Sequence, residues 1–427
     1  MSLKLLEKTR WLALASMLAL ATGATAGCAA DGAADESAPD EGASTDDITQ
    51  VNHAKVKRQS IGNCWIYAMH SWAEALNKGA TNEELNLSET YMTYWHWFEQ
   101  ITNGSVGEEL STGGSYTTAA GLIDRYGMIP EGTFIPSEAD SEMSSTQSSA
   151  LATINASLKS GDLKDPAVRR DRKKVRAALD KAFGLRPEMV ESLNKVFGEG
   201  VTRTLDRSWA SRKPSGGILR AKDIPARLKD PTTGQMGKGT LQDALGTGSW
   251  YRRDGKMAWQ EADYPSDAAG RRKFEQRVQK ALNDGFPVII SWKVDFNALT
   301  SKAEFSLQEL KSRGPGRQGG HMTVLHDYQA DVPGLGLLKA GEQATPDQMT
   351  KALSDDTKIV FWRTKNSWGG IRPDRWSEAA IPGYHELMND YMQGPIKECA
   401  EVNHTSDPNN CPRQVTPWWD AVLPAGY

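Results

Sequence analysis

The stretch QSIGNCWIYAMHSW, residues 59–72, decides how the rest of this 427-residue sequence is interpreted. Apolar side chains recur at helical spacing through residues 65–76, which predicts a buried amphipathic helix. A Gly-Asn pair just before it suits the loop that enters the helix, and Gly79 is expected to end it. Cys64 therefore falls at a predicted helix N-terminus, where the helix dipole stabilises a thiolate.

A cysteine in that position has two interpretations, an inert buried thiol or a nucleophile. Two later segments favour the nucleophile. His321 follows two glycines at the start of a predicted strand, and the block Lys-Asn-Ser-Trp-Gly at 365–369 follows another strand. A Cys early, a His late and an Asn later still is the chain order expected for a Cys-His-Asn triad. We therefore predict a triad of Cys64, His321 and Asn366.

Together these segments resemble the papain-like cysteine peptidases, in which the cysteine motif, a small residue before the histidine and an Asn-Ser-Trp-Gly block recur. The resemblance implies that Cys64 is the nucleophile, that His321 is the general acid and base, and that Asn366 orients the imidazole. It also implies that Trp368 shields the histidine–asparagine hydrogen bond, and that Gln59 donates a side-chain N–H to an oxyanion hole beside the backbone N–H of Cys64. Gln59 stands one residue closer to the cysteine than in most of the family.

The likeness extends to Gly113 and Gly114, which resemble the family's substrate-facing glycine pair. A main chain without side chains can pair with an extended peptide, whereas a plain loop turn is the alternative interpretation. Within the family the sequence is most similar to the bleomycin hydrolase and aminopeptidase C group, through residues 86–89, 127–130 and 383–391. That group acts on N-terminal residues by inserting its own C-terminal tail into the cleft, and residues 418–427 of this chain do not match that tail.

Helical patterns come first along the chain and strands last, which predicts an α+β fold. The resemblance implies a papain-like arrangement, in which a helical sub-domain and a β-rich sub-domain flank the active-site cleft. One peptidase domain is expected over 51–427, with a helical and loop insertion at about 140–260. The Ser-rich residues 141–164 are expected to form a surface loop, and the basic cluster 169–176 a solvated helix face. Further elements are predicted as helices over 88–101, 165–209 and 274–282, and as strands over 287–294, 322–325 and 359–363.

The N-terminus has the features of an export signal. Basic residues precede an apolar run at 11–21 that is too short to span a bilayer, and small residues lead up to Cys28. This pattern resembles the lipobox of bacterial lipoproteins, although Thr25 stands where an aliphatic residue is usual, and ordinary cleavage after Ala26 is the alternative. We predict a signal peptide over 1–27, lipidation of Cys28 and a disordered acidic tether over 28–50. The protein is then exported, as a lipoprotein on the outer membrane or cell surface, or otherwise as a periplasmic or secreted protein.

Composition limits the partners and cofactors. The formal net charge is −4, which favours neither nucleic acid nor an anionic membrane surface, so a lipid anchor would be the only attachment to a membrane. Cys399 and Cys411 remain after the lipidated and catalytic cysteines, and in an exported protein they are predicted to form a disulfide. His326 does not fit the helical zinc pattern, and five residues along a strand place it on the opposite face from His321. No metal and no cofactor is expected.

The sequence thus predicts a thiol peptidase that hydrolyses peptide or protein substrates through an acyl-enzyme, with exopeptidase and endopeptidase action both open. Two alternatives remain, an acyl transferase that uses the same triad and a catalytically silent surface protein that binds peptides. Cleavage-site preference and oligomeric state do not follow from the sequence.

Overall fold

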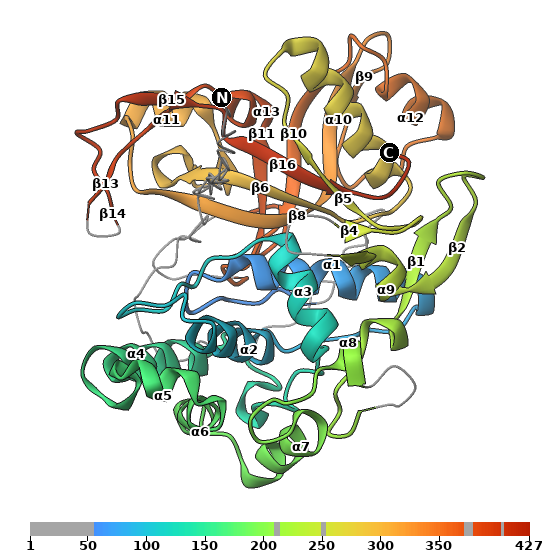
Figure 1. Cartoon of the computed structure of the whole chain (residues 1–427). Helices are drawn as coiled ribbons and strands as arrows, with labels where there is room; N and C mark the ends of the chain where they lie inside the picture. The colour runs from blue at the N-terminus through green and yellow to red at the C-terminus, as the bar shows by residue number, and fades with distance from the viewer. Residues whose placement is uncertain (1–54, 209–213, 249–252, 371–378, 403–404) are drawn as a thin grey trace, which may run out of the picture.

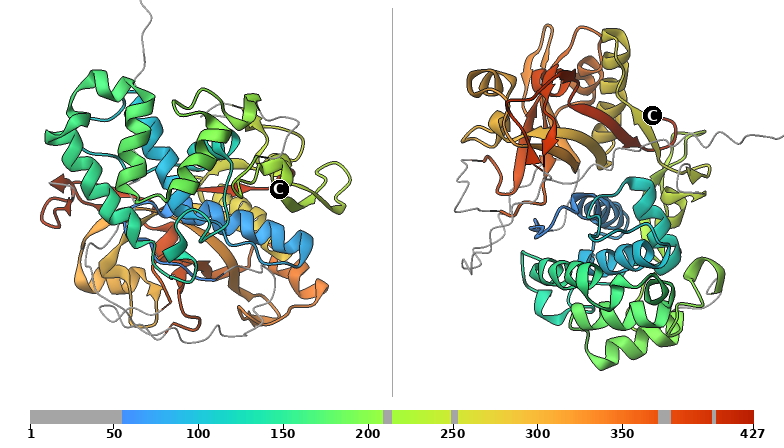
Figure 2. Two further views of the ribbon diagram at one scale, coloured as in Figure 1. Left: turned by 90° about the horizontal axis from the view of Figure 1, so that it is seen from below. Right: turned by 60° about the vertical axis from the view of Figure 1, so that its left-hand side comes forward.

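The computed structural model describes residues 55–208, 214–248, 253–370, 379–402 and 405–427. The helices between residues 89 and 208 gather on one side, and most strands between residues 260 and 423 lie on the other (Figures 1 and 2). The predicted signal peptide, the tether and Cys28 lie outside the described residues. In the part of the chain that the structure describes, no helix combines the length and the apolarity needed to cross a membrane.

Helix α1 (Cys64–Thr81) lies between the two layers and is longer than predicted (Figure 1). It starts at Cys64, as the sequence predicts, but it runs through Gly79, so the predicted end at Gly79 is wrong. The helix ends at Asn82, whose left-handed backbone (φ 61°) directs its N–H to the carbonyl of Lys78. Asparagine tolerates that conformation better than most residues, which is why it can serve as a C-terminal cap.

Helix α2 (Glu89–Thr102) carries the aromatic core of the helical layer. Ser88 caps it by accepting a hydrogen bond from the N–H of Tyr91. Trp95 is fully buried and stacks on Tyr126 of α3 (Tyr116–Tyr126), with ring centroids 4.0 Å apart and 3° between the planes. The aromatic residues of α2 therefore pack in the core of the helical layer.

Residues expected to form a surface loop over 141–164 instead form helix α4 (Ser145–Ser160), so that prediction is wrong. Ala150, Ile154 and Leu158 form a single buried stripe at a spacing of four residues. Serine is a weak helix former, and the helix is poor in apolar residues outside the stripe. Tertiary packing of this narrow stripe outweighs the weak propensity, which local sequence cannot show.

The expectation that residues 169–176 form a solvated helix face is wrong for Arg176. Its side chain is 2% exposed and lies over the rings of Tyr94 and Trp95, with its guanidinium carbon 6.0 and 5.5 Å from the ring centroids. Asp180, one helical turn later, lies 3.6 Å from its guanidinium. The ring faces and the carboxylate offset the burial of this charge. The helices that complete this layer are α5 (Pro166–Arg170), α6 (Arg172–Ala182), α7 (Pro187–Phe197) and α8 (Leu205–Ser208), with 3-10 turns η1 (Pro136–Glu138) and η2 (Asp162–Lys164).

The main sheet has the strand order β5-β16-β6-β8-β10-β11-β7, with β9 paired to β8. Its described pairs are antiparallel except β11 with β7. The three predicted strands are all present; those predicted over 322–325 and 359–363 extend beyond their ranges at both ends, and the one predicted over 287–294 is shifted by one residue. The strands are β5 (Gln260–Asp263), β6 (Val288–Asp295), β7 (Glu304–Phe305), β8 (Gln318–Val332), β9 (Gly336–Leu338), β10 (Lys358–Lys365), β11 (Tyr384–Met388) and β16 (Trp418–Leu423).

Shorter elements surround the sheet. Helix α10 covers the predicted helix at 274–282 and starts earlier than expected, at Ala268. The remaining helices are α9 (Leu241–Leu245), α10 (Ala268–Asn283), α11 (Leu307–Arg313), α12 (Pro346–Ala352) and α13 (Asn389–Gln393), with turns η3 (Ala221–Asp223) and η4 (Phe296–Ala298). The remaining strands pair as β1 (Pro225–Lys229) with β2 (Met236–Thr240), β3 (Thr247–Gly248) with β4 (Arg253–Asp254), β12 (Ile396–Glu398) with β15 (Arg413–Val415), and β13 (Glu401–Val402) with β14 (Thr405–Ser406).

The predicted α+β class, with helices first and strands last, is confirmed. Helix α1 packs against β8, so the helical layer and the sheet meet where α1 begins. The fold thereby brings residues near position 64 next to residues near position 321.

Candidate active site

Cys64 lies where the two layers meet. It is the first residue of α1, and its side chain is 1% exposed. The backbone N–H of Met322 on β8 donates to its sulfur at 3.2 Å, so the neighbour of His321 in the chain contacts the cysteine. Cys399 and Cys411 form a disulfide, as predicted.

His321 is buried in β8, opposite Trp292 of β6 in the sheet register. Its Nε2 lies 2.7 Å from Oδ1 of Asn366, which makes Nε2 the protonated nitrogen, because a carboxamide oxygen can only accept. The other nitrogen, Nδ1, is buried without a hydrogen-bond partner among the described residues. Burial lowers the pKa of His321 to about 4, although the bond to Asn366 opposes the shift. The ring is therefore neutral near pH 7, with the lone pair of Nδ1 able to take a proton.

Asn366 follows the last residue of β10, and its oxygen faces the imidazole. That oxygen also accepts from the N–H of Ser367 at 2.8 Å, and the backbone N–H of Asn366 donates to Gly383 at 3.1 Å. Hydrogen bonds therefore fix both the main chain and the carboxamide of Asn366. The structure thus joins His321 to Asn366 by a direct hydrogen bond. Cys64 is linked to this pair through Met322, the residue that follows His321.

Trp368 covers the histidine. Its indole stacks on the ring of His321 with centroids 4.7 Å apart and 19° between the planes, and it is 5% exposed. Phe305 and Phe296 lie against the indole, at centroid distances of 6.1 and 5.5 Å. An apolar cover of this kind excludes water from the imidazole–carboxamide bond, which strengthens it. This position fits the shielding role that the resemblance implies for Trp368.

Gln59 is tied to the asparagine block. Its backbone N–H donates to Ser367 O at 2.9 Å, and its Oε1 accepts from the Ser367 hydroxyl at 2.5 Å. Its Nε2 donates to Ile61 O at 2.8 Å, which closes the shortened loop before Cys64. A carboxamide nitrogen carries two hydrogens, so this bond leaves a second one to donate. The backbone N–H of Cys64 belongs to the first turn of α1, where no carbonyl of the helix can accept it.

The glycine pair lies beside the cysteine. The carbonyl of Thr112, next to Gly113, accepts from the indole N–H of Trp65 at 2.8 Å, so the loop is attached to the residue after Cys64. A β-carbon on Gly114 would lie 2.4 Å from the indole ring of Trp65. Glycine is therefore required at position 114 by packing against the helix, a reason that the sequence did not show.

This contact predicts the effect of Gly114→Ala. The added methyl group would overlap the indole of Trp65, so we expect a loss of about 1–3 kcal/mol in the free energy of unfolding, as for other overpacked sites. Gly121→Ala on α3 is the matched control, because nothing lies within 4 Å of its added β-carbon and alanine favours a helix. Urea denaturation of both variants measures the difference. Equal stability of the two variants would show that Trp65 does not restrict position 114.

A buried ionic cluster lies next to the site and was not predicted from the sequence. The Lys57 ammonium lies 2.7 Å from Glu89 and 2.9 Å from Glu131, with Glu89 2% exposed. Burial lowers the pKa of Lys57, but the surrounding carboxylates outweigh it and raise the pKa above its usual value. Burial lowers the pKa of Lys365, the neighbour of Asn366, to about 8. Scattered single charges such as these carry no pattern in the sequence from which the cluster could have been found.

His385 is a second histidine beside the triad and was also missed. It lies on β11 opposite Thr364 of β10, and its Nδ1 lies 3.3 Å from the carboxamide nitrogen of Asn366. Its position in a Tyr-His-Glu-Leu sequence carries no signal of a functional histidine. By contrast His326, weighed above as a metal ligand, is buried with its ring against Tyr384. Within the described ranges no three His, Cys, Asp or Glu side chains form a group that could hold a metal ion.

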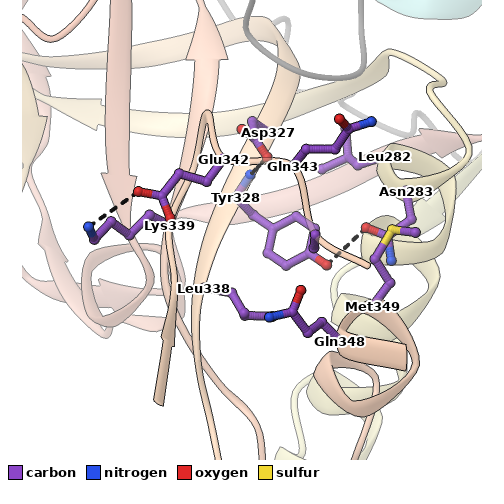
Figure 3. Close-up of a pocket in the computed structure, with 11 residues that line it drawn as sticks. Leu282, Asn283, Asp327, Tyr328, Leu338, Lys339, Glu342, Gln343, Gln348 and Met349 are labelled. Carbon is purple, nitrogen blue, oxygen red and sulfur yellow. Dashed lines mark hydrogen bonds and ion pairs between the residues drawn. The ribbon is translucent and has the colours of Figure 1, made fainter. Parts of the chain in front are cut away.

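A separate cavity of about 90 Å³ lies between α10, β8 and α12 (Figure 3). None of Cys64, His321 and Asn366 lines it. Its polar side chains satisfy one another, since the Tyr328 hydroxyl donates to Asn283 at 2.9 Å and Lys339 pairs with Glu342 at 3.2 Å (Figure 3). The cavity therefore does not contribute to the site around Cys64.

The fold and the site define an α+β protein in which a cysteine at a helix N-terminus meets a histidine–asparagine pair on a sheet. No family model matches the sequence, and no curated protein matches it. The solved structures to which it is similar include cysteine proteases. One is xylellain from Xylella fastidiosa, at 12% identity over 93% of this chain and 96% of that chain, with a TM-score of 0.34. The Carica candamarcensis cysteine protease CMS1MS2 matches at 13% identity over 87% and 93%, with a TM-score of 0.32. Because these identities and TM-scores are low, the function of this chain is inferred below from the geometry of its site.

Proposed function

We propose that this chain is a cysteine peptidase of the papain-like kind, with Cys64, His321 and Asn366 as its triad. The observation that carries the proposal is the 2.7 Å bond from His321 to Asn366, with the adjoining residue, Met322, donating to the Cys64 sulfur. These contacts give one imidazole nitrogen a fixed partner, leave the other buried without a hydrogen-bond partner among the described residues, and place the residue after His321 against the Cys64 sulfur. Transfer of the thiol proton to Nδ1 of His321 would then produce the thiolate.

The first half of the reaction forms an acyl-enzyme. The Cys64 thiolate attacks the carbonyl carbon of the scissile bond, and the carbonyl electron pair moves onto its oxygen. The N–H of Cys64 and the second hydrogen of Gln59 Nε2 are the donors proposed to hold that oxyanion. The intermediate collapses with cleavage of the C–N bond, and the leaving amine takes the proton from His321.

The second half releases the acid. His321 removes a proton from water, and the resulting hydroxide attacks the thioester carbonyl. The second intermediate expels the Cys64 thiolate, which pairs again with the protonated imidazole. Asn366 keeps Nε2 bonded throughout, so Nδ1 remains the nitrogen that exchanges the proton.

The path of residues 418–427 favours endopeptidase action. Trp292 of β6 lies opposite both Trp418 and His321, whereas Val422 lies opposite Ile289. Strand β16 therefore runs away from the His321 end of the sheet as it approaches the C-terminus. Tyr427 contacts Lys229 and Asp284. Residues 418–427 therefore do not lie where they could block a substrate, unlike the tail that the resemblance attributes to the bleomycin hydrolase and aminopeptidase C group.

A peptide library with free and acetylated N-termini tests the proposal on the reduced protein. We expect internal cleavage of both sets at similar rates, since nothing in the proposed mechanism needs a free α-amine. Release of only N-terminal residues, with no cleavage of acetylated peptides, would support exopeptidase action instead. Absence of cleavage in either set would favour a silent peptide-binding protein.

The acyl-transferring alternative uses the same thioester and differs only in the acceptor. Adding an amine such as hydroxylamine or glycinamide during turnover separates the two, because hydrolysis yields mainly the free acid and transfer yields mainly the amide. Export and lipidation of Cys28 are proposed from the sequence alone. Incorporation of labelled palmitate, and its loss in Cys28→Ala, would test the lipid anchor.

A further inference from the structure

Asn366 has a second fixed partner besides His321. Its Oδ1 accepts from His321 and from the N–H of Ser367, and its nitrogen lies 3.3 Å from Nδ1 of His385. A carboxamide fits its site in two orientations that differ only by exchange of oxygen and nitrogen. The Ser367 N–H can only donate, so it selects the oxygen. An unprotonated Nδ1 on His385 can only accept, so it selects the nitrogen, and both restraints favour the same orientation.

The His385 ring is held in place by packing. It is 9% exposed and meets the edge of the Trp368 indole, with centroids 5.2 Å apart and 82° between the planes. Phe305 lies on another side, at a centroid distance of 6.0 Å. Trp368 also stacks on His321, so one indole contacts both imidazoles. The side chain that covers the catalytic histidine therefore also positions the second one.

We infer that His385 is a positioning residue for the triad, which acts through Asn366 and does not touch the substrate. Its neutral imidazole accepts a hydrogen bond from the carboxamide and so keeps Oδ1 of Asn366 directed at His321. Without that acceptor, the buried N–H group would lose its partner, and the alternative orientation would place an N–H group against Nε2–H of His321. The inference rests on the proposed function only for its kinetic readout.

The test compares His385→Phe, which keeps a ring but removes the acceptor, with His385→Asn, whose side-chain oxygen lies close to the position of Nδ1. In the reduced enzyme we expect His385→Phe to lower kcat about tenfold with KM nearly unchanged, and His385→Asn to recover most of that loss. In an Asn366→Ala background, His385→Phe should have no further effect on kcat, because the residue it acts through is gone. His326→Phe, another buried histidine of the same sheet, is the control expected to leave kcat unchanged.

A second readout does not depend on turnover. In ¹⁵N-labelled Cys64→Ala protein, the Nε2–H proton of His321 should be visible and slow to exchange, and His385→Phe should make its exchange about tenfold faster. A kinetic loss of equal size in the two His385 variants, or an undiminished His385→Phe effect without Asn366, would overturn the inference. So would unchanged exchange of the His321 proton in His385→Phe. If the wild-type chain cleaves no peptide, the proposed function fails and the exchange measurement alone decides the role of His385.

Discussion

Replacing Cys64 with alanine is expected to lower kcat/KM of the reduced protein by about 10⁴-fold or more, because the substitution removes the only atom that forms the acyl-enzyme. The same variant should lose covalent labelling by a peptide epoxide or vinyl sulfone. Cleavage of a fluorogenic peptide by the reduced protein, and the mass increase on labelling, measure the two effects.

Stability is the control for this result. The alanine variant should unfold at nearly the same urea concentration as the reduced wild type, so that lost activity reflects lost chemistry. Cleavage or labelling that persists in folded Cys64→Ala would remove Cys64 from its proposed role.

Lys57→Met is expected to cost about 3–5 kcal/mol of unfolding free energy at pH 7, the largest stability effect proposed for this chain. The ammonium lies within 3 Å of two buried carboxylates, and its removal leaves Glu89 and Glu131 without their cation. Burial alone would raise the pKa of Glu89, but Lys57 and His70 together outweigh it and lower the pKa to about 2. Urea denaturation of the wild type and the variant measures the loss.

The pH dependence of this loss has a definite sign. A carboxylate with a depressed folded-state pKa contributes stability above its unfolded value, near 4.5, and loses it as the pH falls toward 2. The stability difference between wild type and Lys57→Met should therefore shrink between pH 5 and about pH 3. Lys159→Met is the matched control, since its ion pair with Glu109 is half exposed on both sides and should contribute nothing measurable. Equal stability of the Lys57 and Lys159 variants would show that the buried cluster does not contribute to the free energy of unfolding.

The proposed triad could be predicted from the sequence because each member lies in a short motif with its own local structure. Cys64 follows a loop and opens a helix, His321 follows two glycines, and Asn366 opens an Asn-Ser-Trp-Gly block. Strand β8 could be predicted only in part, because the short apolar run at 322–325 marks the centre of a strand that spans 15 residues. The extra length comes from pairing with β6, β10 and β9, which no local pattern records.

Residues that act through distant contacts could not be found in this way. The resemblance implies that Gln59 is an oxyanion donor, but its bonds to Ser367 depend on two segments about 300 residues apart in sequence. Glu89 lies in the first turn of α2, and its pairing with Lys57 appears only in three dimensions. His385 follows a tyrosine on a strand without any motif. Position 114 shows the same limit, because its glycine is explained by the indole of Trp65 and not by a loop alone.

The pH dependence of thiol alkylation tests most directly whether the imidazole of His321 acts on the sulfur of Cys64. Reduced wild-type protein, treated with iodoacetamide and analysed by peptide mass spectrometry, is predicted to be modified at Cys64 rapidly even well below pH 8.5, about where a free cysteine ionises. His321→Ala should shift this profile upward, to that of an ordinary thiol. The same profile in both proteins would mean that histidine and cysteine do not form a reacting pair, and the proposed triad would be wrong.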